Sequence, residues 1–317
     1  MSSSNMIITA SKERVGLLLG VLGVIGFSVT LPATRLAVAH LDPTLVGLGR
    51  SLVPAVLALL LLLVTRAAAP TGRQIKSLMI VAAGVVVGFP LLSAWAMQGL
   101  PAAHGAIVIA ILPLITAIAG AVRTRERPSL GFWLASIVGS AAVLGYVVVS
   151  SPIGLQLADV ALFAAAVVGA VGYAEGGLLA KEIGGWRVIC WALVITAPFL
   201  CIPVAIAAYR HGIAAPPEAW WGFAYVSLIS QFLAFFLWYQ GLAMGGVVRV
   251  SQVQLIQPFA TMAVSAVLLG ESITPVMMVF AAIVVVTIAI GKRMPIAHAE
   301  KEVESFHTRN QSQTAEK

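Results

Sequence analysis

Residues 43–65 read PTLVGLGRSLVPAVLALLLLLVT and contain one charged side chain, Arg50. A helix of about 20 apolar residues crosses the hydrocarbon core of a bilayer, which is roughly 30 Å thick, so this stretch predicts a membrane span. Similar apolar runs recur along the chain. The sequence predicts an all-α membrane protein with ten transmembrane helices, at residues 15–39, 43–65, 75–97, 102–122, 129–150, 157–180, 187–208, 219–242, 246–269 and 273–291.

The composition excludes a water-soluble globular protein. Hydrophobic residues make up 60% of the chain and charged residues 10%, whereas a soluble domain has about 45–50% and about 25%. The net charge of +7 does not indicate a nucleic-acid partner, because the basic residues lie in short gaps between apolar runs and not in one patch. Cys190 and Cys201 lie in one apolar run and are expected to be core residues, so no metal, redox centre or other cofactor is predicted.

The distribution of lysine and arginine predicts that both termini are cytoplasmic. Loops on the cytoplasmic side of a membrane are enriched in basic residues. If residues 1–14 lie inside and ten spans follow, the polar tail at 292–317 is also inside. The outer loops then contain a single basic residue, Arg210. The basic residues of the inner segments are then Lys12, Arg14, Arg66, Arg73, Lys76, Arg123, Arg125, Arg127, Lys181, Arg187, Lys292 and Arg293.

The two halves of the chain share residues in the same order, which indicates an internal repeat. When the first half is aligned on the second with a nearly constant offset in residue number, glycines, an aromatic residue, a basic residue and a glutamine coincide. The matched positions are Gly23 with Gly169, Gly26 with Gly172, Phe27 with Tyr173, Arg35 with Lys181, Gln98-Gly99-Leu100 with Gln240-Gly241-Leu242, Pro113 with Pro258, and Glu126 with Glu271.

Each copy of the repeat contains five helices, so the second copy enters the membrane from the side opposite to the first. This predicts an inverted repeat, related by a pseudo-two-fold axis in the membrane plane. The loop charges agree with the inversion. Arg123-Thr124-Arg125-Glu126-Arg127 is predicted inside, and its counterpart Leu268-Leu269-Gly270-Glu271 carries no basic residue and is predicted outside.

Two five-helix halves, each with a proline and a terminal glutamate in its fourth helix (Pro113 and Glu126, Pro258 and Glu271), resemble the EamA family of the drug/metabolite transporter superfamily. The second copy has Gly270 before its glutamate, where the first has Arg125. The resemblance divides the chain into repeats at 15–150 and 151–291. It implies a bacterial inner-membrane protein that exports or exchanges small metabolites, often amino acids or related amphipathic compounds.

Ionisable residues at membrane depth are costly and are candidates for function. Glu175 is the one acid well inside a predicted span, and two interpretations stay open: it carries a proton for coupled transport, or it forms a static ion pair with an arginine such as Arg50. Arg249 can meet a substrate carboxylate, pair with Glu175, or extend to the headgroups. Arg35 lies about one turn from a helix end and is expected to reach the interface.

Amides and aromatic side chains complete the candidate cavity. Buried amides need polar partners, which a wet central cavity or a neighbouring helix supplies. Aromatic walls with a few fixed polar groups suit an amphipathic small molecule, although core packing also explains each ring. The candidate substrate-binding residues are Phe27, Trp95, Gln98, Tyr173, Glu175, Trp238, Tyr239, Gln240, Arg249, Gln254 and Gln257.

The motifs favour a secondary transporter. No phosphate-binding loop of the form GxxxxGK[ST], HExxH pattern, paired carboxylates or nucleophile elbow occurs, so neither ATP-driven pumping nor an enzyme is expected. The expected partners are a small-molecule substrate and the lipid bilayer, with the oligomeric state open. The alternatives are a channel and a membrane regulator that transports nothing.

Overall fold

The computed structural model describes residues 3–124, 127–150, 156–293 and 296–297. Glu126 and most of the expected tail at 292–317 lie outside these residues. The described chain is helical apart from two paired two-residue strands, β1 (Arg127–Pro128) and β2 (Ile296–Ala297). Its helical segments are α1 (Ser3–Ser28), α2 (Thr30–Val38), α3 (Pro43–Val64), α4 (Gly72–Val81), η1 (Ala82–Gly88), α5 (Phe89–Ala96), α6 (Ala102–Val108), η2 (Ile109–Ile111), α7 (Leu112–Thr124), α8 (Leu130–Ser150), α9 (Leu157–Ile183), α10 (Gly185–His211), α11 (Pro217–Ala224), η3 (Tyr225–Leu233), α12 (Ala234–Gly245), α13 (Val247–Val250), η4 (Ser251–Ile256), α14 (Gln257–Leu269) and α15 (Pro275–Arg293).

Eight helical stretches of the described chain are long and apolar enough to cross a membrane. Helices α8 and α15 lie where the remaining two spans are expected, and they contain shorter apolar segments at Ile137–Val149 and Pro275–Thr287. The prediction of an all-helical, multi-span chain is therefore confirmed, and the count of ten stays a prediction. The eight stretches are Lys12–Val38, Pro43–Val64, Gly72–Ala96, Ala102–Arg123, Leu157–Ile183, Gly185–His211, Pro217–Gly245 and Val247–Leu269.

Local sequence signals explain where several helices begin. The Asp42 carboxylate accepts hydrogen bonds from the backbone N–H groups of Thr44 and Leu45 at the start of α3, as an N-cap residue does. Between α9 and α10 the chain turns at Gly184, and between α12 and α13 at Gly246, with φ angles of 90° and 85°. Residues with a Cβ are strained at such positive φ angles, so glycine makes these sharp reversals possible.

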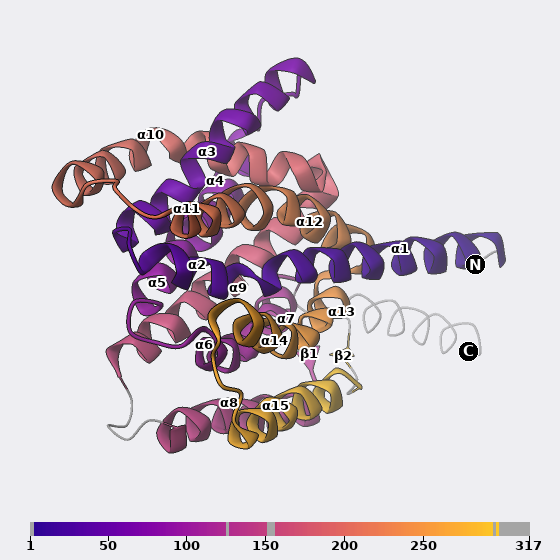
Figure 1. Cartoon of the computed structure of the whole chain (residues 1–317). Helices are drawn as coiled ribbons and strands as arrows, with labels where there is room; N and C mark the ends of the chain where they lie inside the picture. The colour runs from indigo at the N-terminus through magenta and orange to yellow at the C-terminus, as the bar shows by residue number, and fades with distance from the viewer. Residues whose placement is uncertain (1–2, 125–126, 151–155, 294–295, 298–317) are drawn as a thin grey trace, which may run out of the picture.

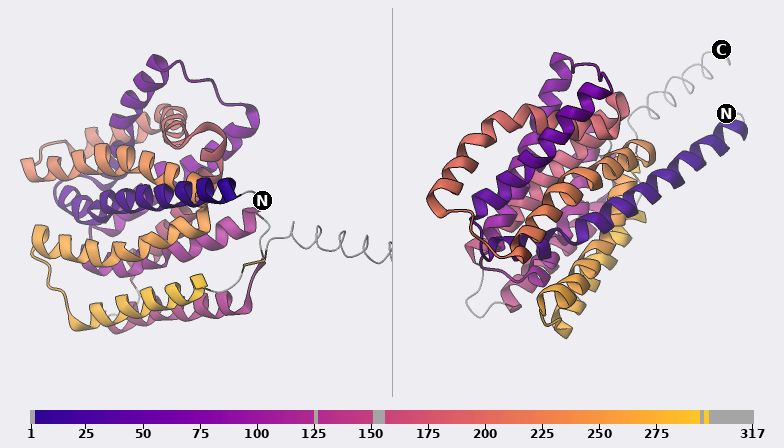
Figure 2. Two further views of the ribbon diagram at one scale, coloured as in Figure 1. Left: turned by 90° about the vertical axis from the view of Figure 1, so that its right-hand side faces the viewer. Right: turned by 45° about the horizontal axis from the view of Figure 1, so that its top comes forward.

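Helices from the two halves interleave across the bundle (Figure 1). Helix α1 packs along α12, α3 along α10, and α8 along α15, while α9 contacts α4, η1, α5 and α7. Figure 2 shows α8 and α15 side by side at one edge of the molecule, away from α3 and α10. The remaining helices surround a centre that is formed by residues of both halves.

Glycines let α1 approach α12 closely. A Cβ on Gly16 would lie 2.6 Å from the backbone nitrogen of Gly245, and a Cβ on Gly23 would lie 3.2 Å from the backbone nitrogen of Trp238. Elsewhere on α1, Gly20 lies against Val250 and Gly26 lies against Ala234. Contacts of this kind are typical of membrane helices, where small residues permit backbone contact.

The same device joins α9 to η1. A Cβ on Gly84 would lie 2.5 Å from the carbonyl oxygen of Val168 and 3.0 Å from the Cα of Gly172. Gly84 and Gly172 therefore permit close contact between η1 and α9.

Departures from α-helical geometry occur at corresponding places in the two halves. The segments η1 and η3 are π-helical, and each interrupts the third apolar run of its half. The segments η2 and η4 are 3-10 helical, and each interrupts the fourth run. Such interruptions leave backbone carbonyls without their usual helical partners and often mark functional positions.

The outer surface of the bundle is apolar, as expected of a lipid-facing surface. Large hydrophobic side chains remain exposed along several helices, for example Val267 (90% exposed) and Phe199 (71% exposed). An exposed apolar surface of this extent is unfavourable in water and favourable in lipid.

We expect Gly84→Ala to lower the melting temperature of the protein in detergent, because the new methyl group meets backbone atoms that cannot rotate away. Overpacking of this kind costs about 1–3 kcal/mol of unfolding free energy. Gly72→Ala is the matched control, since no atom lies within 4 Å of a Cβ at Gly72. Equal melting temperatures for the two variants would contradict the close contact between η1 and α9.

Candidate functional site

A central cavity lies where helices of the two halves meet. The cavity is narrow in this conformation. Its volume, measured as the space open to the centre of a water-sized sphere, is about 10 Å³, which is close to the minimum that holds one water. The first half and the second half both contribute walls. The lining residues are Phe27, Thr30, Arg50, Val85, Phe89, Ile109, Leu112, Tyr173, Ser230, Gln231, Phe235 and Gln257.

Arg50 is the charged residue of this cavity. Its side chain comes from the middle of α3, and the residue is 2% exposed. Its Nη2 donates a hydrogen bond of 3.0 Å to the hydroxyl of Ser230, which lies 2.8 Å from the hydroxyl of Thr30. The Nε and Nη1 atoms of Arg50 have no hydrogen-bond partner. None of the ion pairs among the described residues includes Arg50.

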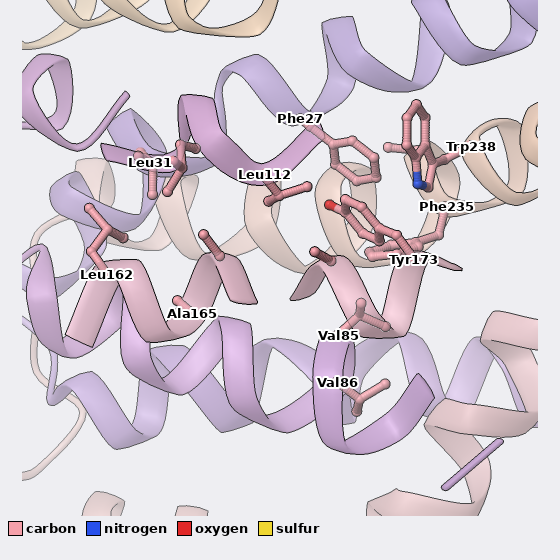
Figure 3. Close-up of a cluster of buried hydrophobic side chains, with 14 of the residues drawn as sticks. Phe27, Leu31, Val85, Val86, Leu112, Leu162, Ala165, Tyr173, Phe235 and Trp238 are labelled. Carbon is pink, nitrogen blue, oxygen red and sulfur yellow. The ribbon is translucent and has the colours of Figure 1, made fainter. Parts of the chain in front are cut away.

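Three aromatic rings that pack together, those of Phe27, Tyr173 and Phe235, line the cavity, and Figure 3 shows them together with Trp238. The ring of Phe27 stacks on Tyr173 with 5.9 Å between centroids and meets Phe235 edge-on at 5.0 Å. Trp238 lies behind them, 5.4 Å from Tyr173. These rings come from α1, α9 and α12, so both halves contribute.

The two π-helical segments meet beside the same cavity. The amide nitrogen of Gln231, in η3, donates a hydrogen bond of 2.9 Å to the carbonyl oxygen of Val85, in η1. The hydroxyl of Ser51 donates to the next carbonyl, that of Val86, at 3.0 Å. These side chains satisfy carbonyls inside η1. The Oε1 atom of Gln231 is buried and accepts no hydrogen bond.

At one end of the bundle, Glu271 links the two halves. Its carboxylate accepts hydrogen bonds from the backbone N–H groups of Ala102 (2.8 Å) and Ala103 (2.7 Å) at the start of α6. Arg35 lies 3.2 Å from the same carboxylate and also donates to the carbonyl of Leu100. A carboxylate at a helix N-terminus is stabilised by the helix dipole and the free N–H groups. We call this the Glu271 end.

At the opposite end, a second ion pair closes the bundle. Glu175, on α9, is 4% exposed and accepts two hydrogen bonds from Arg123, at the end of α7, of 2.7 and 2.9 Å. Of the two open interpretations, the structure shows the ion pair with an arginine, but the partner is Arg123 and not Arg50 or Arg249, because α7 packs directly on α9 and Arg50 lines the central cavity. Arg249 pairs instead with Glu13 of α1. We call this the Glu175 end.

The other predicted site residues are divided between the cavity and the helix contacts. Gln257 lines the cavity, as do Phe27 and Tyr173. The hydroxyl of Tyr239 donates to the Gly172 carbonyl at 3.2 Å, so it joins α12 to α9.

Three more predicted residues lie apart from the lining of the cavity. The Gln240 amide oxygen accepts from the backbone of Gly185 at 3.2 Å, next to the turn between α9 and α10. Trp95 is 41% exposed and Gln98 is exposed, and neither lines the cavity. Gln254 is buried, and both of its amide atoms lack a hydrogen-bond partner.

Residues that the sequence did not single out complete the cavity: the polar Thr30, Ser230 and Gln231, and the apolar Val85, Phe89, Ile109, Leu112 and Phe235. Ser230 and Gln231 lie in η3, where the π-helical turn changes which residues face inward. A helical-wheel projection assumes a regular α-helix with 100° between residues, so it does not predict which residues of a π-helical segment face inward. Their polarity inside an apolar run was the available signal.

A second cavity lies near the Glu271 end, beside a buried pair of titratable residues. The Nε2 atom of His104 lies 2.7 Å from the carboxylate of Asp159. Asp159 also accepts from the backbone of Gln156 at the start of α9, so its role as a helix cap explains the position. This cavity opens at the end of the bundle, and its walls come from residues of the first half, from Gln156, and from Thr274, Val276 and Met277 at the start of α15.

Comparisons with known proteins agree with these features. The model of the EamA-like transporter family matches residues 14–148 and 156–290. The chain is 39% identical over 291 residues to the "Uncharacterized transporter YdeK" of Bacillus subtilis (strain 168), covering 89% of this chain and 99% of that protein. It is 30% identical over 216 residues to a "Probable terminal-alkyne amino-acid exporter" of Streptantibioticus cattleyicolor, covering 66% and 70%.

A solved crystal structure also has a similar fold. It matches with a TM-score of 0.64 at 16% identity, and the match covers 88% of this chain and 96% of the other. Identity this low supports the fold alone.

We expect Glu271→Ala to lower the free energy of unfolding by about 1–3 kcal/mol, because two buried N–H groups and Arg35 lose a charged partner. Thermal unfolding in detergent measures the change. Glu182→Ala is the control: Glu182 forms an ion pair with Arg73, but that pair is exposed, and exposed pairs contribute about 0–1 kcal/mol. A smaller loss for Glu271→Ala than for Glu182→Ala would contradict the role of Glu271 in joining the halves.

Proposed function

Because the chain belongs to the EamA-like transporter family and is a multi-pass membrane protein, we propose that it is a secondary transporter that exports or exchanges a small amphipathic metabolite, such as an amino acid, by alternating access. One observation carries this proposal. Both halves line a single cavity that combines an aromatic wall with a buried guanidinium. Ligand sites commonly have this composition, with apolar walls and a few placed polar groups.

We further propose ten transmembrane helices in two inverted repeats, at residues 15–150 and 151–291. The paired positions of η1 with η3 and of η2 with η4 support the repeat. The contacts support the repeat too. The first helix of each half packs on the third span of the other half: α1 packs on α12, and α9 packs on η1 and α5. In Figure 1 α1 and α9 run in opposite directions, which agrees with an inversion. An inverted repeat provides two end states of similar energy from one packing scheme.

In this conformation, charged contacts hold the bundle together at both ends. We propose that alternating access breaks one of them at a time: the Arg35–Glu271–α6 contact opens the cavity to one side, and the Arg123–Glu175 contact opens it to the other. The basic residues cluster at the Glu175 end, so that end is assigned to the cytoplasm, together with both termini, in a bacterial inner membrane.

The substrate class rests on two supports. The cavity wall is aromatic, so the compound has an apolar part. One relative is named as a probable amino-acid exporter, and we extend that substrate class to this chain as a proposal. No catalytic constellation was found in the sequence, and an enzymatic function is not proposed.

Purified protein in sealed liposomes tests the transporter proposal. We expect saturable uptake of a labelled amphipathic amino acid, such as phenylalanine, leucine or methionine, that is accelerated when the same unlabelled compound is loaded inside. Such counterflow is a property of carriers, because a channel does not couple the two directions. Uptake that never saturates indicates a channel, and no flux of any tested metabolite above empty liposomes favours a regulator without transport.

We propose that Glu175 couples transport to protons. In this step the Glu175 carboxylate separates from Arg123 and binds a proton. Glu175→Gln is then expected to keep counterflow but to lose accumulation driven by a pH gradient, because the amide cannot be protonated and deprotonated. Glu182→Gln, a change to an exposed acid near the end of the same helix, is the control and keeps both activities. Unchanged gradient-driven accumulation in Glu175→Gln refutes coupling through this residue and leaves a structural ion pair.

A further inference from the structure

We infer that Arg50 is the substrate-recognition residue of the central cavity and that it binds a carboxylate group, so that the transported compound is an amphipathic carboxylic acid. The inference rests on the proposed transport function and adds the group by which the cavity selects its substrate. The carboxylate would lie at Arg50, and the apolar part would lie against the rings of Phe27, Tyr173 and Phe235.

The hydrogen-bonding state of Arg50 is the first argument. A guanidinium has five N–H donors, and the protein satisfies it only through the bond from Nη2 to Ser230. The Nε and Nη1 atoms are buried and have no partner. Nη2 keeps a second hydrogen and shares one edge of the guanidinium with Nε and another with Nη1. The bond to Ser230 uses one of the two Nη2 hydrogens, so one of these edges still offers two parallel free donors, which is the geometry that a carboxylate accepts.

Charge is the second argument. Two arginines nearer the ends of the bundle have acidic partners: Arg35 pairs with Glu271 and Arg123 with Glu175. Within the described residues no acid pairs with Arg50, although it is the most buried of these three. Removing a charge from water without a counter-charge is costly. A substrate carboxylate would supply the missing negative charge at the position where the protein leaves it open.

The local framework holds Arg50 in a fixed place, which a recognition residue requires. Ser230 accepts from Arg50 and is itself within 2.8 Å of Thr30, so α3, η3 and α2 are joined at this point. Gln231, which also lines the cavity, is held by its bond to Val85, and its amide oxygen is buried without a hydrogen-bond partner. This acceptor suits a donor group of the substrate, such as an ammonium group.

The experiment compares compounds that differ only at the carboxyl group. Purified protein is heated with phenylalanine, leucine or methionine, and with the amide and the decarboxylated amine of each. We expect the acids to raise the melting temperature and the amides and amines to leave it unchanged, since a ligand stabilises the state that it binds. Arg50→Gln is expected to weaken binding of the acids by about 10–100-fold, the loss of a charge-assisted hydrogen-bond pair. Arg50→Lys is expected to bind the acids more tightly than Arg50→Gln but more weakly than the wild type.

A second measurement separates recognition from a purely structural role and needs no ligand. Without substrate, Arg50→Met is expected to melt about 2 °C or more above the wild type, because an uncompensated buried charge is replaced by an apolar side chain of similar length. If Arg50 served only to join α3 to η3, the same change would lower the melting temperature. Arg73→Met is the control, because the Arg73 side chain is 84% exposed and remote from the cavity.

The outcomes distinguish this inference from the transport proposal. Amides or amines that bind or show counterflow as well as the acids overturn carboxylate recognition and leave a transporter. Stabilisation by chloride alone that depends on Arg50, with no added effect of the acids, overturns it in favour of a resident inorganic anion. Destabilisation by Arg50→Met together with no binding of any acid overturns it as well. A third result is possible: the acids bind and Arg50→Met is more stable than the wild type, but no compound shows counterflow. That result contradicts the transport proposal and leaves carboxylate recognition by Arg50 standing.

Discussion

Backbone contact between the two halves, permitted by glycine, determines how the centre of this protein is built. Gly84 and Gly172 bring η1 against α9, and Gly16 and Gly23 bring α1 against α12. These approaches place Phe27, on α1, against Tyr173, on α9. In a membrane no hydrophobic force drives helices together, because lipid is as apolar as their side chains. Close packing and a few polar contacts therefore have to hold the cavity walls in place.

The polar contacts follow a consistent pattern. Nearer the ends of the bundle, Arg35, Arg123 and Arg249 are paired with acids within the protein, and each pair joins the first half to the second. The charge at the centre, Arg50, is held by neutral hydroxyl groups. A neutral framework around a cation is the arrangement that a site for a mobile anion requires, since a fixed acid would compete with the ligand.

Much of this arrangement was predictable from the sequence. The helical spans, the family and the cavity residues Phe27 and Tyr173 follow from hydropathy and from the internal repeat. The partner of Glu175 did not follow, because pairing depends on which helix packs against α9, and sequence periodicity does not report that. Gln98 and Gln240 match in the repeat but lie at helix ends. Ser230 and Gln231 were missed because a π-helical segment changes the direction in which its side chains point.

The contact of Glu271 with α6 has a consequence for energy conservation in the cell. This carboxylate comes from one half and holds the first N–H groups of a helix of the other half, so in the transport cycle proposed above, opening at this end requires several charge-assisted bonds to break together. An empty carrier would seldom make that step by thermal motion. In the proton-coupled cycle proposed above, this contact would limit proton leak through the empty carrier and so preserve the gradient across the membrane.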